Sequence, residues 1–197
     1  MEKGIVIMNH ITKISKKLSE YGLDAMLITS SSGERYALGF HGEGLLLVTR
    51  DGARYTTDGR YLEAAREQIV GAEVSLVTAG SGHLSQAKEF IQVHGLRNVG
   101  FESGEMTVDA HRRYSQELPC ILTPAQGLLG DLRASKDEGE LAHMRRAQEI
   151  TDEAFKAILN FIRPGLTERE IAARLVYELL RRGGEQVSFD PIGAAGP

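Results

Sequence analysis

Short apolar runs alternate with helical stretches over the first two thirds of the chain, and this alternation most restricts how the chain can fold. Strands that alternate with helices form a sheet whose faces the helices cover, as in an α/β domain. We therefore predict a mixed sheet flanked by helices. The predicted strands span residues 25–29, 44–49, 53–57, 73–78, 98–101 and 120–122, and the predicted helices between them span residues 62–69, 83–93 and 108–118.

Local signals indicate where some elements begin and end. Asn9 is a predicted N-cap for a helix that begins near Ile11, and Gly22 is the predicted stop of that helix. Arg50-Asp51-Gly52 separates two apolar runs, and an aspartate-glycine pair tolerates the positive φ that tight turns require. The runs at residues 44–49 and 53–57 are therefore predicted to pair as an antiparallel hairpin.

A domain limit is predicted near Asp131. Proline and glycine punctuate the chain just before it, at Pro124, Gly127 and Gly130. We therefore predict an N-terminal domain over residues 1–131 and a second region over residues 132–197.

Two long helices are predicted in the second region, each introduced by a capping box, in which two side chains accept the N–H groups at a helix start. The two pairs with this spacing are Ser135 with Glu138, and Thr167 with Glu170. Each helix carries one apolar face, for which core packing is the usual meaning. The first face contains Leu141, Met144, Ala147, Ile150, Ala154, Ile158 and Phe161, and the second contains Ile171, Leu175, Val176 and Leu179. Gly183-Gly184 stops the second helix, and residues 186–192 are predicted to form a strand.

Charge and apolar runs exclude two classes of partner. The formal net charge is −4 and no basic run occurs, so nucleic acid is not an expected partner. No segment approaches the roughly 20 apolar residues that span a bilayer, and the apolar stretch at residues 4–8 is too short for a signal-peptide core. Cys120 is the only cysteine, which fits a reducing compartment. We expect a cytoplasmic protein with no membrane partner.

Several short segments follow one another along the chain, and their order is informative. They are Gly39-Phe40 with Gly42 and the run to Thr49, Thr57-Asp58-Gly59-Arg60-Tyr61, Gly100-Phe101-Glu102, Leu132-Arg133 with Ser135-Lys136-Asp137-Glu138, Arg163-Pro164-Gly165-Leu166-Thr167-Glu168, and Ser188-Phe189-Asp190-Pro191-Ile192 with Gly196-Pro197. In this order and spacing they resemble the creatinase/prolidase N-terminal domain, followed by the start of the pita-bread catalytic domain of an Xaa-Pro aminopeptidase or prolidase.

This resemblance implies a two-domain cytoplasmic exopeptidase that cleaves next to proline and assembles as a dimer or larger. A creatinase-like amidinohydrolase is the related alternative. In the peptidases, two divalent metal ions (manganese, cobalt or zinc) share and activate a water. By the resemblance, the catalytic histidine follows the last Gly-Pro, and the metal ligands (two aspartates, one histidine and two glutamates) lie further on. We therefore expect a truncated chain that has no catalytic, cofactor-binding or metal-binding residue and is inactive alone.

The remaining histidine, cysteine and glycine residues do not indicate substitute chemistry. No two histidines have metal-ligand spacing, so surface or loop positions are the favoured interpretation. The six are His10, His41, His83, His94, His111 and His143. Cys120 has no nearby histidine or helix start, which favours a buried structural thiol over a nucleophile. Gly39, Gly42 and Gly44 lack a phosphate-binding pattern, so a turn is the simpler interpretation.

Asp58 and Arg60 allow a functional interpretation, since a carboxylate and a guanidinium at a strand end can orient a peptide. The favoured interpretation of Asp58 is an N-cap for a helix that begins near Arg60. In the resembling family, loops of this domain face a neighbouring subunit's active site, which leaves that role open for Arg60 and Tyr61.

Two hypotheses about function therefore stand. In the first, the chain is the N-terminal part of a metal-dependent Xaa-Pro peptidase, and a peptide substrate binds only in the full-length protein. In the second, it is a non-catalytic dimerisation or regulatory module. In either case we expect self-association, or pairing with a full-length subunit, through the apolar faces of the two long helices.

Overall fold

A computed structural model describes residues 9–195 of the chain. The apolar stretch at residues 4–8 and the Gly196-Pro197 of the last segment lie outside the described residues. The chain divides into two compact units, residues 1–135 and 136–197. We call them the N-terminal unit and the helical unit, and describe each by itself.

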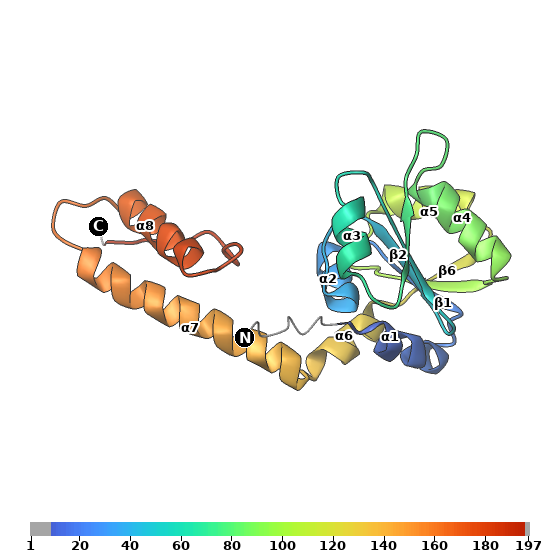
Figure 1. Cartoon of the computed structure of the whole chain (residues 1–197), viewed down its shortest axis with the longest axis horizontal. Helices are drawn as coiled ribbons and strands as arrows, with labels where there is room; N and C mark the ends of the chain where they lie inside the picture. The colour runs from blue at the N-terminus through green and yellow to red at the C-terminus, as the bar shows by residue number, and fades with distance from the viewer. Residues whose placement is uncertain (1–8, 196–197) are drawn as a thin grey trace. The chain divides into compact units, whose positions relative to one another are not determined.

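A six-stranded sheet forms the centre of the N-terminal unit, with strand order β4-β3-β2-β1-β5-β6 (Figure 1). The strands are β1 (Ala25–Ile28), β2 (Leu45–Thr49), β3 (Ala53–Thr57), β4 (Glu73–Leu76), β5 (Asn98–Phe101) and β6 (Ile121–Pro124). β2 pairs with β1 and with β3 in antiparallel fashion, whereas the other three pairings are parallel. The predicted mixed sheet is therefore confirmed, and so is the antiparallel pairing of the hairpin. Neither Asp51 nor Gly52 has a positive φ, so the turn is not closed in the way the sequence suggested. Thr49 closes it instead: its N–H and its hydroxyl donate to the Gly52 carbonyl oxygen, and its hydroxyl oxygen accepts the Gly52 N–H.

Helices cover both faces of this sheet (Figure 1). They are α1 (Ile11–Lys17) with the 3-10 turn η1 (Leu18–Tyr21), α2 (Ser31–Leu38), α3 (Leu62–Gln68), α4 (His83–Val93), α5 (Val108–Glu117) and α6 (Gln126–Ala134). Side chains alternate along a strand, so Met26 and Ile28 pack with α1, α2, α3 and α6, while Ala25 and Leu27 pack with α4 and α5. Burial on both faces explains why β1 and β2 are apolar throughout.

Two helices of the N-terminal unit were not predicted. α2 begins within the Ser30–Gly33 cluster because Ser30 is its N-cap, and the Ser30 side chain accepts the Gly33 N–H at 2.9 Å. α6 contains Gly127 and Gly130, so these glycines do not end the domain. The unit therefore extends to Ser135 rather than to the predicted limit near Asp131.

The predicted ends of the first helix need one correction. The N-cap residue of α1 is His10, not Asn9, although the Asn9 side chain accepts the Ile11 N–H at 2.9 Å. Gly22, with φ of 64°, ends η1 as predicted.

The helical unit consists of α7 (Glu138–Phe161) and α8 (Glu168–Arg181), which pack against each other. The box predicted at Ser135 and Glu138 is wrong, because Ser135 ends α6 and the reciprocal hydrogen bonds join Asp137 to Glu140. The box at Thr167 is confirmed.

The prediction of a strand over residues 186–192 is wrong, because these residues form an irregular segment. A strand needs a partner for its backbone hydrogen bonds, and the described part of the chain offers this segment none. No described helix is long and apolar enough to cross a membrane.

Candidate functional site

A buried carboxylate lies at the start of α2. Ser30 caps that helix and places Glu34 in its first turn, and Gly39, with φ of 65°, ends the helix and turns the chain toward β2. The Glu34 side chain is only 1% exposed. A charged group is seldom buried unless polar partners surround it, so its contacts define the site.

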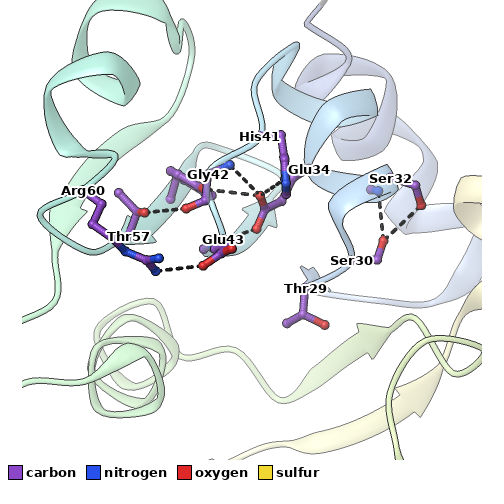
Figure 2. Close-up of polar contacts among 12 residues, drawn as sticks. Thr29, Ser30, Ser32, Glu34, His41, Gly42, Glu43, Thr57 and Arg60 are labelled. Atoms are coloured by element: carbon purple, nitrogen blue, oxygen red, sulfur yellow. Dashed lines mark hydrogen bonds and ion pairs between the residues drawn. The ribbon is translucent and has the colours of Figure 1, made fainter. Parts of the chain in front are cut away.

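The Glu34 carboxylate accepts hydrogen bonds from the loop that follows α2 (Figure 2). The N–H groups of Gly44 and Gly42 donate to it at 2.7 and 3.2 Å, and the Tyr55 hydroxyl donates at 3.3 Å. His41 Nδ1 lies 3.4 Å from the same carboxylate. Burial, and then the Glu34 charge, raise the pKa of Tyr55 above its ordinary value, so the phenol remains a donor at neutral pH. Glu34 thus fixes residues 39–44 against β3.

The same loop leaves no room for side chains at two of its glycines. A Cβ atom on Gly44 would lie 2.4 Å from the Tyr55 ring, and one on Gly42 would lie 2.5 Å from Phe40. Together with Gly39 these glycines form a turn, as the sequence interpretation favoured. Thr57 also anchors this loop to β3, because its hydroxyl donates to the Gly42 carbonyl oxygen at 2.8 Å.

Exposed charges lie at the outer side of this loop. Glu43 has φ of 46°, which is uncommon outside glycine, and its carboxylate accepts from the Arg60 guanidinium at 2.8 Å. Arg60 also donates to Asp58 at 2.7 Å, and its guanidinium stacks on the Tyr61 ring at 5.0 Å. The Arg60 hydrogen bonds hold the pKa of Asp58 below its ordinary value. One guanidinium therefore lies between two carboxylates at the outer side of the fixed loop, and Figure 2 shows its contact with Glu43.

Asp58 does not cap α3. Its side chain accepts the Arg60 N–H at 2.8 Å within the turn before the helix, while the N-cap position of α3 is Tyr61. The N-cap interpretation of Asp58 is therefore wrong, because the chain makes one more turn before the helix begins.

A second buried carboxylate joins β1 to β5. Glu102 follows β5 and accepts the N–H groups of Thr29 and Ser30 at 2.9 and 3.0 Å, and the Ser30 hydroxyl at 2.6 Å. Both carboxylate oxygens of Glu102 therefore accept hydrogen bonds from the end of β1 and the start of α2, and the role of this contact is to hold these elements together. Neither Glu34 nor Glu102 was singled out as a buried group from the sequence, because the partners of each lie elsewhere in the chain.

The histidines lie apart, and one of them is buried. His10 stacks on Tyr36 with ring centroids 4.2 Å apart, and its Nδ1 is 2.7 Å from the Tyr36 carbonyl oxygen. The surface interpretation is therefore wrong for His10, because an aromatic neighbour and a backbone partner make its burial favourable.

Groups for covalent or metal chemistry are not assembled in the described part of either unit. Burial raises the pKa of the half-buried Cys120 thiol, which makes it a poor nucleophile at neutral pH. Among the described residues, neither unit by itself brings together three side chains that could hold one metal ion.

Comparison with protein families gives two consecutive matches. Residues 10–135 match the creatinase/prolidase N-terminal domain, and residues 142–197 match metallopeptidase family M24. The join between the two matches falls where the N-terminal unit ends.

Individual relatives agree with these matches. The uncharacterized peptidase YqhT of Bacillus subtilis is 32% identical over 188 residues, which are 94% of this chain and 53% of YqhT. The solved Xaa-Pro dipeptidase from Bacillus anthracis superposes with a TM-score of 0.84 at 30% identity, over 91% of this chain and 50% of that one. The N-terminal domain of cytoplasmic peptidase PepQ from Mycobacterium tuberculosis is 32% identical with a TM-score of 0.55, over 62% of this chain and 97% of that one. The chain spans about half the length of the curated relatives it matches.

Proposed function

We propose, from the premise that this chain belongs to the creatinase/prolidase N-terminal domain family over residues 10–135, that it serves as the N-terminal part of a metal-dependent Xaa-Pro peptidase. The observation that carries the proposal is the order of the two family matches, on a chain that spans half of an Xaa-Pro dipeptidase. The catalytic part is of the pita-bread type in this proposal, and α7 and α8 are its opening helices. A cytoplasmic location fits the single cysteine.

The chemistry of such a peptidase comes from two divalent ions, manganese, cobalt or zinc, which activate a water. This chain's residues do not fit that pair, because within neither unit do the described residues offer three ligands around one point. No step of the reaction is therefore assigned to them. Their role in the proposal is to shape access to the substrate through the loop that Glu34 holds.

A chimera tests this role. Residues 1–197 are joined to the part of the Bacillus anthracis Xaa-Pro dipeptidase that follows its matching half. We expect manganese-dependent cleavage of an Xaa-Pro dipeptide that a chelator abolishes, and no cleavage by the same dipeptidase part alone. A chimera that folds, as judged by circular dichroism, yet leaves Xaa-Pro dipeptides intact would contradict the proposal.

The chain alone gives a complementary test. We expect it neither to bind two divalent ions specifically nor to release residues next to proline. Equilibrium dialysis with manganese and zinc, followed by a peptidase assay, measures both. Stoichiometric metal together with chelator-sensitive activity would show that the ligands are present in this chain.

A non-catalytic dimerisation or regulatory module is the second candidate function. The exposed apolar side chains of α7, among them Phe155 and Leu159, favour it because they offer a surface to another subunit. Recovery of a full-length peptidase subunit in a pull-down with this chain would support this role. Recovery of the chain alone would count against pairing with a full-length subunit.

A further inference from the structure

One carboxylate of α8 is shared by three arginines. Glu178 is 1% exposed, and it accepts from Arg174 at 2.5 Å, from Arg181 at 3.1 Å and also from Arg182. The Arg182 hydrogen bond is the largest of the causes that lower the pKa of Glu178 to about 2. Glu178 therefore stays charged and holds the three guanidinium groups in place.

The positive charge of this cluster exceeds its negative charge. Arg182 has a second carboxylate, Glu153, at 3.7 Å. Among the described residues, Arg174 and Arg181 pair with no carboxylate other than Glu178. Their side chains are 41% and 55% exposed, so both can accept a further anionic partner.

An exposed aromatic ring lies between the two arginines. Tyr177 is 54% exposed, and the guanidinium carbons of Arg174 and Arg181 lie 5.2 and 6.0 Å from its ring centroid. Arg174 and Arg181 are seven positions apart, or two helical turns, roughly 10 Å along the axis. The helix dipole accounts for basic residues in the last turn only, so it does not explain Arg174.

We propose that the Arg174–Tyr177–Arg181 face of α8 binds an acidic helical segment of another protein. Carboxylates seven residues apart would meet the two guanidinium groups, and an apolar side chain between them would lie on Tyr177. A second copy of this chain is a poor match, because no helix in its described part carries two acidic residues seven positions apart. Nucleic acid is disfavoured by the net charge of −4.

The test uses the 197-residue chain and a fluorescent alanine-based helical peptide with two glutamates seven residues apart and a leucine midway. Fluorescence anisotropy is expected to show binding that weakens as salt rises. In Arg174→Ala/Arg181→Ala the affinity is expected to fall about tenfold or more. The control Arg145→Ala/Arg169→Ala removes the same charge from exposed positions elsewhere on α7 and α8, and is expected to leave binding unchanged.

Tyr177→Ala separates loss of binding from loss of folding, since it keeps all three arginines. It is expected to weaken the peptide severalfold without loss of helical circular dichroism. The proposal is overturned if the peptide does not bind the wild-type chain. It is also overturned if Arg174→Ala/Arg181→Ala binds the peptide as tightly as the control variant does, or if a peptide with glutamine in place of its two glutamates binds with unchanged affinity. Displacement of the peptide by single-stranded DNA of equal charge would likewise show that the face is unselective.

Discussion

The two units differ in what covers their apolar side chains. In the N-terminal unit, helices lie on both faces of the sheet, and the side chains of β1 and β2 are buried on either side. In the helical unit, α7 buries only Ile150, Ala154 and Ile158, and α8 buries no apolar residue. Among residues 9–195, eight of the thirteen large apolar side chains that are exposed lie in this shorter unit. A sheet that is covered on both faces forms a hydrophobic core on each face, whereas two packed helices bury only the side on which each contacts the other.

The largest expected effect comes from separating the units. A chain that ends after Ser135 is expected to unfold in one cooperative transition, with a free energy of unfolding in the range of about 5 to 15 kcal/mol usual for domains. Residues 136–197 alone are expected to show no such transition, because two helices with few buried contacts are marginal in water. Thermal melts followed by circular dichroism compare the two. A cooperative melt of the helical fragment would remove the contrast between the units.

Glu34→Ala tests whether the N-terminal unit depends on its buried carboxylate. The change leaves the Gly42 and Gly44 N–H groups and the Tyr55 hydroxyl without their acceptor, and each unpaired buried donor costs about 1 to 3 kcal/mol. We expect the free energy of unfolding in urea to fall by about 2 to 4 kcal/mol, after partial rehydration of the loop.

Glu43→Ala is the matched control for Glu34→Ala. It removes an exposed carboxylate from the same loop, where one surface ion pair is worth about 0 to 1 kcal/mol. Equal losses in the two variants would mean that the loop is not held by Glu34.

Phe155→Glu with Leu159→Glu tests whether the exposed face of the helical unit finds cover in another copy. Ile171 and Leu175 lie on the apolar face predicted for α8, but both are half-buried, so glutamate there would disturb the packing of that helix. Burying each large apolar side chain is worth about 1.5 to 3 kcal/mol. We expect light scattering to show the wild type as a dimer or larger and the double variant shifted toward monomer. A wild type that is monomeric at micromolar concentration would show that this face needs no second copy.

The smallest expected effect is the pH dependence that Glu178 contributes to the helical unit. Because the pKa of Glu178 is lowered to about 2 from an ordinary value of 4.5, its ion pairs contribute stability above pH 4.5. That contribution is lost as pH falls from 4.5 toward 2. We expect the helical circular dichroism of the 197-residue chain to decrease over this window. Glu178→Gln should lack the Glu178 part of that decrease, whereas Glu149→Gln, at an exposed ion pair, should keep it.

The sequence predicted best those elements whose causes are local. The β2–β3 hairpin depends on the hydrogen bonds between Thr49 and Gly52, and the start of α8 depends on Thr167 and Glu170, so each cause lies within a few residues. Two overlapping patterns at the start of α7 explain the wrong capping box, since Ser135 and Asp137 both precede a glutamate by three positions.

Features that depend on distant partners could not be predicted. The carboxylate of Glu34 is buried because Gly42, Gly44 and Tyr55 come to it, and no local pattern marks such a meeting. Conversely, residues 186–192 have the apolar character of a strand but no neighbour that would make them one. Gly127 and Gly130 wrongly indicated a break in the chain for a related reason. Both lie in α6, where the packing of Leu128 and Leu129 outweighs the low helix propensity of glycine.

The two outer strands of the sheet bear on how the protein behaves at high concentration. Unpaired strand edges invite other chains to add to a sheet, and short edges with charges or proline resist this. β4 and β6 have four residues each, β4 begins with the exposed Glu73, and β6 ends with Pro124, which has no N–H to offer. Fibrillar, sheet-to-sheet aggregation is therefore disfavoured, and any precipitate should retain the circular dichroism of helices.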